Sequence, residues 1–138
     1  MSGKIPRMTV RVQSVPSNSR VEVCAEYNPT RYAAELHEFQ RVVHTWCQHN
    51  FPKSEPWETL VGAQEELGEL AHAFLKYKQG IRGIDREKFI EDGEDAVGDL
   101  VIYLADFCAR SGLKFERAIV STWEKVQQRD WAANPISG

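Results

Sequence analysis

Residues 57–78 read WETLVGAQEELGELAHAFLKYK, and the fold class rests on this stretch. Its apolar residues recur at alternating spacings of three and four, which is the period of a helix that packs one face against a neighbour. The recurring positions are Leu60, Ala63, Leu67, Leu70, Phe74 and Tyr77. The stretch therefore predicts an amphipathic helix with a seam of the kind found in helical bundles.

Three further segments show a helical pattern. Residues 31–50 have apolar positions three and four apart, with Thr30 as the expected N-cap. Asp85 is expected to cap a helix that ends near Arg110, in which Gly93 could introduce a kink and Gly98 could permit close helix approach. A fourth helix is expected from about residue 114 to residue 131. Four helices joined by short connections predict an all-α fold, a four-helix bundle.

Residues 1–29 differ from the rest of the chain. Two short stretches, residues 9–13 and 21–24, alternate between apolar and polar residues on either side of a turn-forming run that begins at Pro16. This pattern favours a β-hairpin, and a flexible arm is the open alternative, because an isolated hairpin is only marginally stable. We therefore expect an N-terminal arm over 1–29, a helical domain over 30–132 and a flexible tail over 133–138.

Composition narrows the classes of partner. The formal net charge is −3, so the chain has no general attraction to nucleic acid or to anionic lipid. No apolar run reaches the roughly 20 residues that span a bilayer, and no signal peptide is evident. The cysteines, Cys24, Cys47 and Cys108, are odd in number and widely spaced, which favours reduced thiols in a cytoplasmic protein.

Two acidic stripes suggest chemistry. On the first helix quoted, Glu65, Glu69 and His72 share a polar face with Glu66 at its flank, and alone they would pass for a solvated surface. The helix that follows Asp85 has a second stripe, and its Asp99 leads into the apolar run LVIYL, which predicts a helix buried on most sides. The aspartates of this stripe are Asp92, Asp95, Asp99 and Asp106. Facing carboxylates repel unless a cation lies between them, so the pattern predicts a site for Mg²⁺, with Mn²⁺ as a possibility.

These residues resemble a known family. Residues 65–70, EELGEL, match the EExxE half of the motif of the MazG-like all-α nucleoside triphosphate pyrophosphohydrolases. Residues 95–99, DAVGD, resemble the ExxD half, except that Ala96 stands where the family has glutamate. Asp95 lies on the same helix face as Asp99, so we assign the missing role to Asp95. The resemblance extends over about residues 31–131.

The resemblance implies Mg²⁺-dependent hydrolysis of a nucleoside triphosphate to the monophosphate and pyrophosphate, in the house-cleaning of nucleotide pools. It also implies a homodimer or homotetramer in which subunits complete one another's bundle. The expected metal ligands are Glu66, Glu69, Asp95 and Asp99. Glu65 would orient or deprotonate the attacking water, and it is grouped with Glu66 as catalytic. The candidate substrate contacts are Lys76, Lys125 and Arg129 for phosphate and Trp46 and Tyr103 for the base.

Other functions stay open at this point. A phosphoribosyl-ATP pyrophosphatase resembles the same motif. A helical module that binds metal or oligomerises without turnover is favoured by Ala96. A nucleic-acid-binding bundle is disfavoured, because the one dense basic cluster, residues 76–88, lies beside acidic residues.

Overall fold

A computed structural model describes residues 27–132 and residue 135 of the chain, and these residues form four helices and no strand. The all-α prediction is therefore confirmed for the part of the chain that the structure describes. The predicted N-terminal hairpin lies outside the described residues, and of the arm predicted over 1–29 only 27–29 are described, where Pro29 already belongs to the first helix. None of the described helices is long and apolar enough to cross a membrane.

Helix α1 spans Pro29–Asn50, and its N-cap is Asn28 rather than the expected Thr30. The Asn28 Oδ1 atom accepts a hydrogen bond from the backbone N–H of Arg31 at 3.0 Å. Pro29 occupies the first helical turn, where its missing N–H costs no hydrogen bond and its fixed φ suits the helix. The cap was mispredicted because the proline moves the start of the helix two residues toward the N-terminus.

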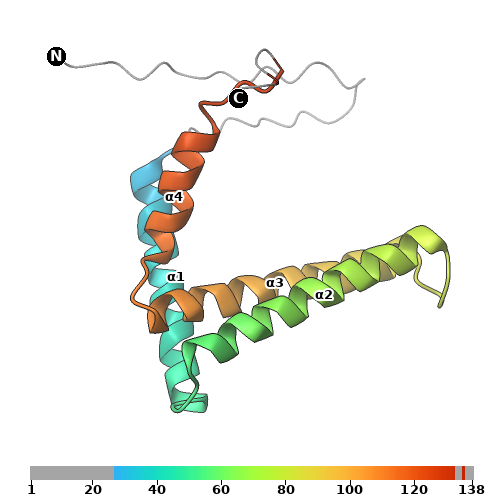
Figure 1. Cartoon of the computed structure of the whole chain (residues 1–138), viewed down its shortest axis with the longest axis horizontal. Helices are drawn as coiled ribbons and strands as arrows, with labels where there is room; N and C mark the ends of the chain where they lie inside the picture. The colour runs from blue at the N-terminus through green and yellow to red at the C-terminus, as the bar shows by residue number, and fades with distance from the viewer. Residues whose placement is uncertain (1–26, 133–134, 136–138) are drawn as a thin grey trace.

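Helices α2 (Pro56–Gln79) and α3 (Arg86–Arg110) form a long antiparallel hairpin (Figure 1). Gly80 ends α2 in the left-handed conformation, with φ at 65°, where a glycine has no Cβ to clash. Asp85 caps α3 as predicted, and its Oδ1 accepts a hydrogen bond from the Lys88 N–H at 2.8 Å. These two signals fix both ends of the connection between the helices.

Helix α3 runs unbroken through Gly93. A Cβ added at Gly93 would lie 3.5 Å from Leu70 and from Phe89, whereas no atom lies within 4 Å of such a Cβ at Gly98. Of these two glycines, Gly93 is therefore the one that faces α2, where it is within ordinary contact distance of Leu70, and the predicted close approach at Gly98 is absent. The hydrophobic period identified α3 correctly, and only the three-dimensional contact distinguishes its two glycines.

Helix α4 spans Phe115–Val126 and ends five residues before the expected position. Beyond it, the backbone N–H of Gln128 bonds to the Lys125 carbonyl and that of Arg129 to the Val126 carbonyl. Both are hydrogen bonds between residues i and i+3, which form tight turns of the 3₁₀ type in place of the α-helix.

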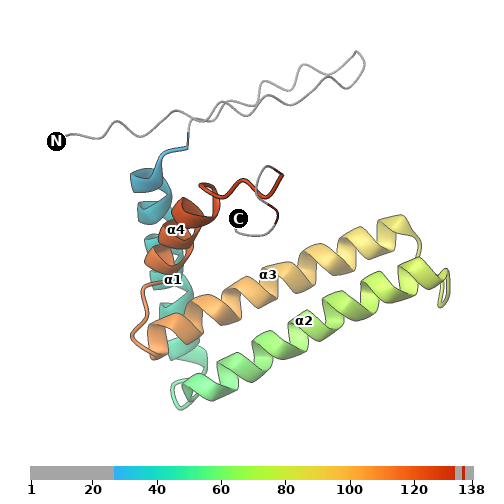
Figure 2. The ribbon, with the colours of Figure 1, turned by 45° about the horizontal axis from the view of Figure 1, so that its top comes forward.

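The four helices do not all pack against one another. Helices α1 and α4 lie side by side across the end of the hairpin at which α3 finishes, and α1 contacts α3 but not α2 (Figure 2). The core at this junction consists of Ala105, Cys108 and Phe115, packed against Leu36, Val43 and Leu104 among others. Most of the hairpin thus extends beyond the helices that cover its end.

The predicted seam of α2 is divided between two surroundings. Ala63 is buried, and Leu70 and Tyr77 face α3, where the Tyr77 ring stacks on Phe89 with 5.2 Å between centroids. Leu60, Leu67 and Phe74 are about half exposed. The period was correct, but α2 has only one neighbouring helix among the described residues, so this half of its apolar stripe stays largely exposed, although the Phe74 ring still meets Phe89 with 5.5 Å between centroids.

Candidate metal and nucleotide site

The α2–α3 hairpin has an acidic side and an apolar side. Because both helices have a 3.6-residue period, positions three, four and seven apart share a side, and the burial pattern shows which sides face inward. The acidic side carries Glu65, Glu69 and His72 from α2 and Asp92, Asp95 and Asp99 from α3. The opposite side carries Leu60, Leu67, Phe74, Ile90 and Val97. The two predicted acidic stripes therefore belong to one surface.

Glu66 is half-buried at the flank of this acidic side. Burial raises the pKa of its carboxyl group above the usual value, and the neighbouring charges of Glu69, Asp99, Glu65 and Asp95 raise it further, in that order. Each of these neighbours destabilises the ionised form of Glu66 through like-charge repulsion. The five acidic residues chosen from the sequence are thus brought together in one electrostatic cluster.

A hollow of about 290 Å³ lies beside the cluster, lined by Glu69, His72, Ala73, Ile84, Asp92 and Asp95. It joins Asp95 of α3 to Glu69 of α2. It also adds His72 and Asp92, which the sequence placed on the stripes without a ligand role. The Asp92 Oδ1 atom pairs with Lys88 Nζ at 2.8 Å, so one of the added carboxylates already has a cationic partner.

The donors of the cluster are carboxylate oxygens, the ligand type that Mg²⁺ and Mn²⁺ prefer. Among the described residues, no three Asp, Glu, His or Cys side chains converge closely enough to hold an ion together. Glu65, Glu69, Asp95 and Asp99 are exposed, and exposed carboxylates of like charge favour rotamers that keep them apart. Their chemistry suits a hard divalent cation, and binding would require rotation of these side chains toward it.

The burial of position 96 accounts for the alanine that stands there in place of the motif's glutamate. Ala96 is 4% exposed and lies in the seam between α2 and α3, whereas Asp95 is exposed on the acidic side. Asp95, and not position 96, is therefore on the exposed face that carries Asp99. Of the charges that raise the pKa of Glu66 after burial, that of Asp95 contributes least.

Asp99 is exposed, contrary to the expectation that the apolar run after it marks a helix buried on most sides. Val97 and Ile102 are also exposed, at 46% and 37%. The reason is again the open arrangement: at this level α3 has α2 on one side, and much of its remaining surface is uncovered.

Tyr103 lies next to the acidic cluster. Burial raises the pKa of its hydroxyl group, and the charges of Glu66, Glu65 and Asp99 raise it further. Its ring rests against Gly62 of α2, with no room for a Cβ between them. Lys76 follows His72 by one turn on the same side of α2, and its Nζ donates to Gln79 Oε1 at 3.1 Å. Both predicted contacts are therefore on or beside the acidic side.

The other three predicted substrate contacts lie outside the hairpin, on α1, on α4 and in the residues after α4. Helix α4, with Lys125 in its last turn, runs along α1 and away from the hairpin (Figure 1). The Arg129 guanidinium lies over the Trp131 ring, 5.9 Å from its centroid. Trp46 is 58% exposed on α1 and meets Phe51 edge-on.

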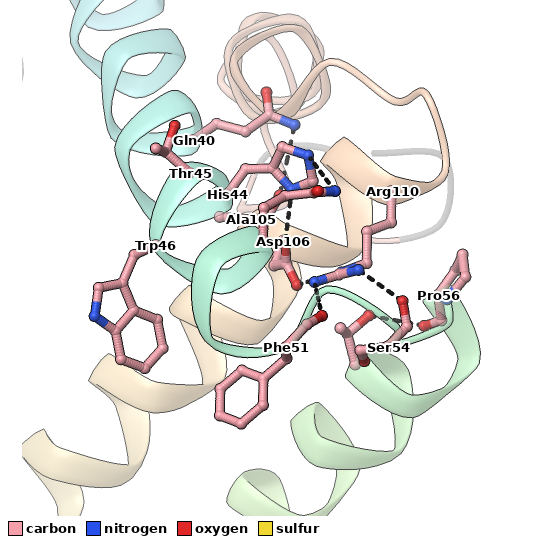
Figure 3. Close-up of polar contacts among 12 residues, drawn as sticks. Gln40, His44, Thr45, Trp46, Phe51, Ser54, Pro56, Ala105, Asp106 and Arg110 are labelled. Carbon is pink, nitrogen blue, oxygen red and sulfur yellow. Dashed lines mark hydrogen bonds and ion pairs between the residues drawn. The ribbon is translucent and has the colours of Figure 1, made fainter.

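Asp106, the last aspartate of the predicted stripe, belongs to a separate hydrogen-bonded network at the end of α3 (Figure 3). It is 3% exposed, and its oxygens bond to His44 Nδ1 at 2.8 Å and to Arg110 Nε at 2.7 Å. Arg110 also donates to the backbone carbonyls of Ser54 at 2.6 Å and Phe51 at 3.2 Å. The network ties α1 and the connection before α2 to the end of α3.

Sequence reasoning gave His44 no role and overlooked Arg110. The Asp106–Arg110 spacing of four residues was the available signal, because it places the two side chains on one helix face. Cys47 lies against the same network: burial, followed by the charge of Asp106, raises the pKa of its thiol to about 11. Cys47 and Cys108 are buried free thiols, as expected.

Comparison with protein-family models, with curated proteins and with solved structures found no match.

Proposed function

We propose that this chain hydrolyses a nucleoside triphosphate to the monophosphate and pyrophosphate, using Mg²⁺ on the acidic side of the α2–α3 hairpin. The observation that carries the proposal is that carboxylates from both helices gather on one side of the hairpin, beside a hollow that Glu69 and Asp95 line. Burial and then these neighbouring charges raise the pKa of Glu66. A surface that concentrates this much negative charge is stabilised by a divalent cation, and a triphosphate brings such a cation with it.

In this proposal, Glu66, Glu69, Asp95 and Asp99 hold the metal. A bound Mg²⁺ would lower the pKa of a coordinated water and offset charge on the phosphate oxygens. Glu65 is exposed one residue from Glu66, so it can accept the proton of a water positioned beside the cluster. The water oxygen forms the new bond to phosphorus, and the anhydride bond to the pyrophosphate group breaks.

We further propose that a second copy of the chain covers the apolar side of the hairpin. Helices α1 and α4 cover this side only near the end of α3, where Val101 and Leu104 pack against the core. The uncovered remainder includes Leu67 and Val97, each nearly half exposed, on the side opposite the carboxylates. A second hairpin laid against this surface would close a four-helix bundle and bury a contiguous apolar patch. It would also leave both acidic sides open to substrate.

The proposed function is tested by measuring pyrophosphate release from a panel of canonical and modified nucleoside triphosphates and phosphoribosyl-ATP, with and without Mg²⁺. Glu66→Gln and Asp99→Asn should each lower the rate by roughly 100-fold or more. Glu94→Gln is the matched control, because Glu94 is exposed on α3 but points away from the acidic side. It should retain the wild-type rate.

The panel also separates the alternatives. Release from phosphoribosyl-ATP alone would select the phosphoribosyl-ATP pyrophosphatase. Mg²⁺ binding without release from any substrate would select the helical metal-binding module, which the absence of a glutamate at position 96 favours. Equal rates in the wild type and in folded Glu66→Gln and Asp99→Asn variants would show that the chemistry lies elsewhere.

A further inference from the structure

Among the glycines that the structure describes, Gly62 makes the closest contact between α2 and α3. This contact lies at one end of the acidic cluster. A Cβ added at Gly62 would lie 2.5 Å from Tyr103 Cζ and 2.8 Å from Cδ1, far inside van der Waals contact. No other described glycine lies this close to a side chain. Gly62 is buried, so the ring is held directly against the backbone of α2.

This contact is one helical turn from the carboxylates on both sides. Gly62 precedes Glu65 and Glu66 by three and four residues, and Tyr103 follows Asp99 by four. The contact with Gly62 and these spacings place the ring beside the carboxylates, in keeping with the pKa of its hydroxyl group, which burial and then the charges of Glu66, Glu65 and Asp99 raise. The position of the ring therefore sets how far apart the two helices stand where their carboxylates face the same side.

We propose that Gly62 and Tyr103 act together as positioning residues, with the ring on the glycine fixing the distance between α2 and α3 and hence the affinity of the acidic cluster for a divalent cation. The inference rests on the proposed function, since it concerns the same cluster. Groups that orient ligands without touching the ion typically alter metal affinity by 10–100-fold when they are changed. Moving the ring would shift the carboxylates of one helix relative to those of the other.

The test uses Mn²⁺ as the probe and follows its free signal by electron paramagnetic resonance in titrations of the full chain. Gly62→Ala should weaken Mn²⁺ binding by about 10-fold or more. Gly68→Ala and Gly98→Ala are matched controls, because they add the same methyl group to the same two helices where no atom lies within 4 Å. Both should bind Mn²⁺ within about twofold of the wild type.

Changes at Tyr103 test the mechanism of the effect. Tyr103→Leu should weaken Mn²⁺ binding, and Gly62→Ala should then add little, because the ring that collides with the new methyl group is gone. Tyr103→Phe keeps the ring and should retain wild-type affinity. If Gly62→Ala does not fold, the Mn²⁺ affinities of Tyr103→Leu and Tyr103→Phe still test the positioning role.

The outcomes separate this inference from the proposed function. If the wild type binds no Mn²⁺, the metal site itself is wrong. If the wild type binds Mn²⁺ and folded Gly62→Ala binds it equally well, with only a lower unfolding temperature, the contact serves packing alone and the positioning role is wrong. The positioning role is also wrong if Gly62→Ala and Tyr103→Leu weaken binding additively, or if Tyr103→Phe loses affinity as Tyr103→Leu does.

Discussion

A single buried carboxylate, that of Asp106, joins three parts of the chain. It bonds to His44 on α1 and to Arg110 on α3, and Arg110 in turn holds the backbone of the connection between α1 and α2. Helix α1 packs against α3 but not against α2, so this network adds to the apolar core a polar link between α1 and the base of the hairpin. The planar guanidinium suits such a role, because its several N–H donors point in fixed directions.

Removal of this carboxylate should therefore be costly. Asp106→Ala leaves a buried arginine without its partner, and breaking a buried pair from one side typically costs about 3–5 kcal/mol. We expect a loss of this size in the free energy of unfolding, measured by urea denaturation. Glu38→Ala is the control, because its ion pair with Arg41 lies on the surface and should contribute less than about 1 kcal/mol. Similar losses in the two variants would contradict the structural role of the network.

Gln40, a neutral residue, also joins separate parts of the chain through its buried side chain. Its Nε2 donates to the carbonyl of Leu113 at 3.1 Å, and its Oε1 accepts from the backbone N–H of Phe115 at 3.2 Å. One buried amide thus satisfies backbone groups at the turn between α3 and α4, which would otherwise be costly to bury. The sequence does not indicate this role, because nothing distinguishes Gln40 from the other polar residues of α1.

At the scale of the element, α2 and α3 are held together by small residues. Gly62, Ala63 and Ala73 on α2 and Gly93 and Ala96 on α3 are buried along the hairpin, and larger side chains stack at its far end. Small side chains let the two backbones approach closely, so the helix pair is narrow where the carboxylates flank it. This narrowness accounts for the alanine at position 96: the seam has little space for a longer side chain.

Ala96→Glu would place the carboxylate of the family motif in this seam. Since position 96 is 4% exposed, the substitution buries a charge without a partner, and we expect the metal-free protein to lose about 2–4 kcal/mol of stability. The measurement is chemical denaturation in the presence of a chelator. Ala118→Glu makes the same change at an exposed position of α4 and should have little effect. If the two variants are equally stable, position 96 is not enclosed by the hairpin.

At the scale of the whole molecule, the hairpin is only partly covered. No large side chain among the described residues is fully buried, and many apolar side chains are exposed. A chain of this length can bury a larger core than this one does within a single copy. One part of the exposed apolar surface lies on the side of the hairpin opposite the carboxylates, and it comprises Leu60, Leu67, Phe74, Ile90 and Val97. This arrangement suits the proposed subunit, which pairs through one side and binds substrate through the other.

Charged substitutions on the apolar side should dissociate the assembly. Leu67→Glu and Val97→Glu each put a carboxylate at the centre of the proposed interface, and desolvating it would oppose association. We expect sedimentation velocity to show a shift from dimer or tetramer to monomer. Leu113→Glu is the matched control, because this leucine is comparably exposed, at 52%, but lies in the turn between α3 and α4. A monomeric wild type, or an unchanged assembly in both variants, would exclude this interface.

The sequence by itself determined the four helices, the Asp85 cap, the turn at Gly80 and the gathering of the carboxylates into stripes. These features depend on residues within a few positions of one another, where the helical period and hydrogen bonds to the backbone decide the outcome. Only the tertiary structure decided which half of the α2 seam meets α3, that Asp106 is buried while Asp99 is exposed, and that Gly62 receives the Tyr103 ring. The helical period gives the angle of a side chain around its own helix axis. It does not say which helix, if any, stands at that angle.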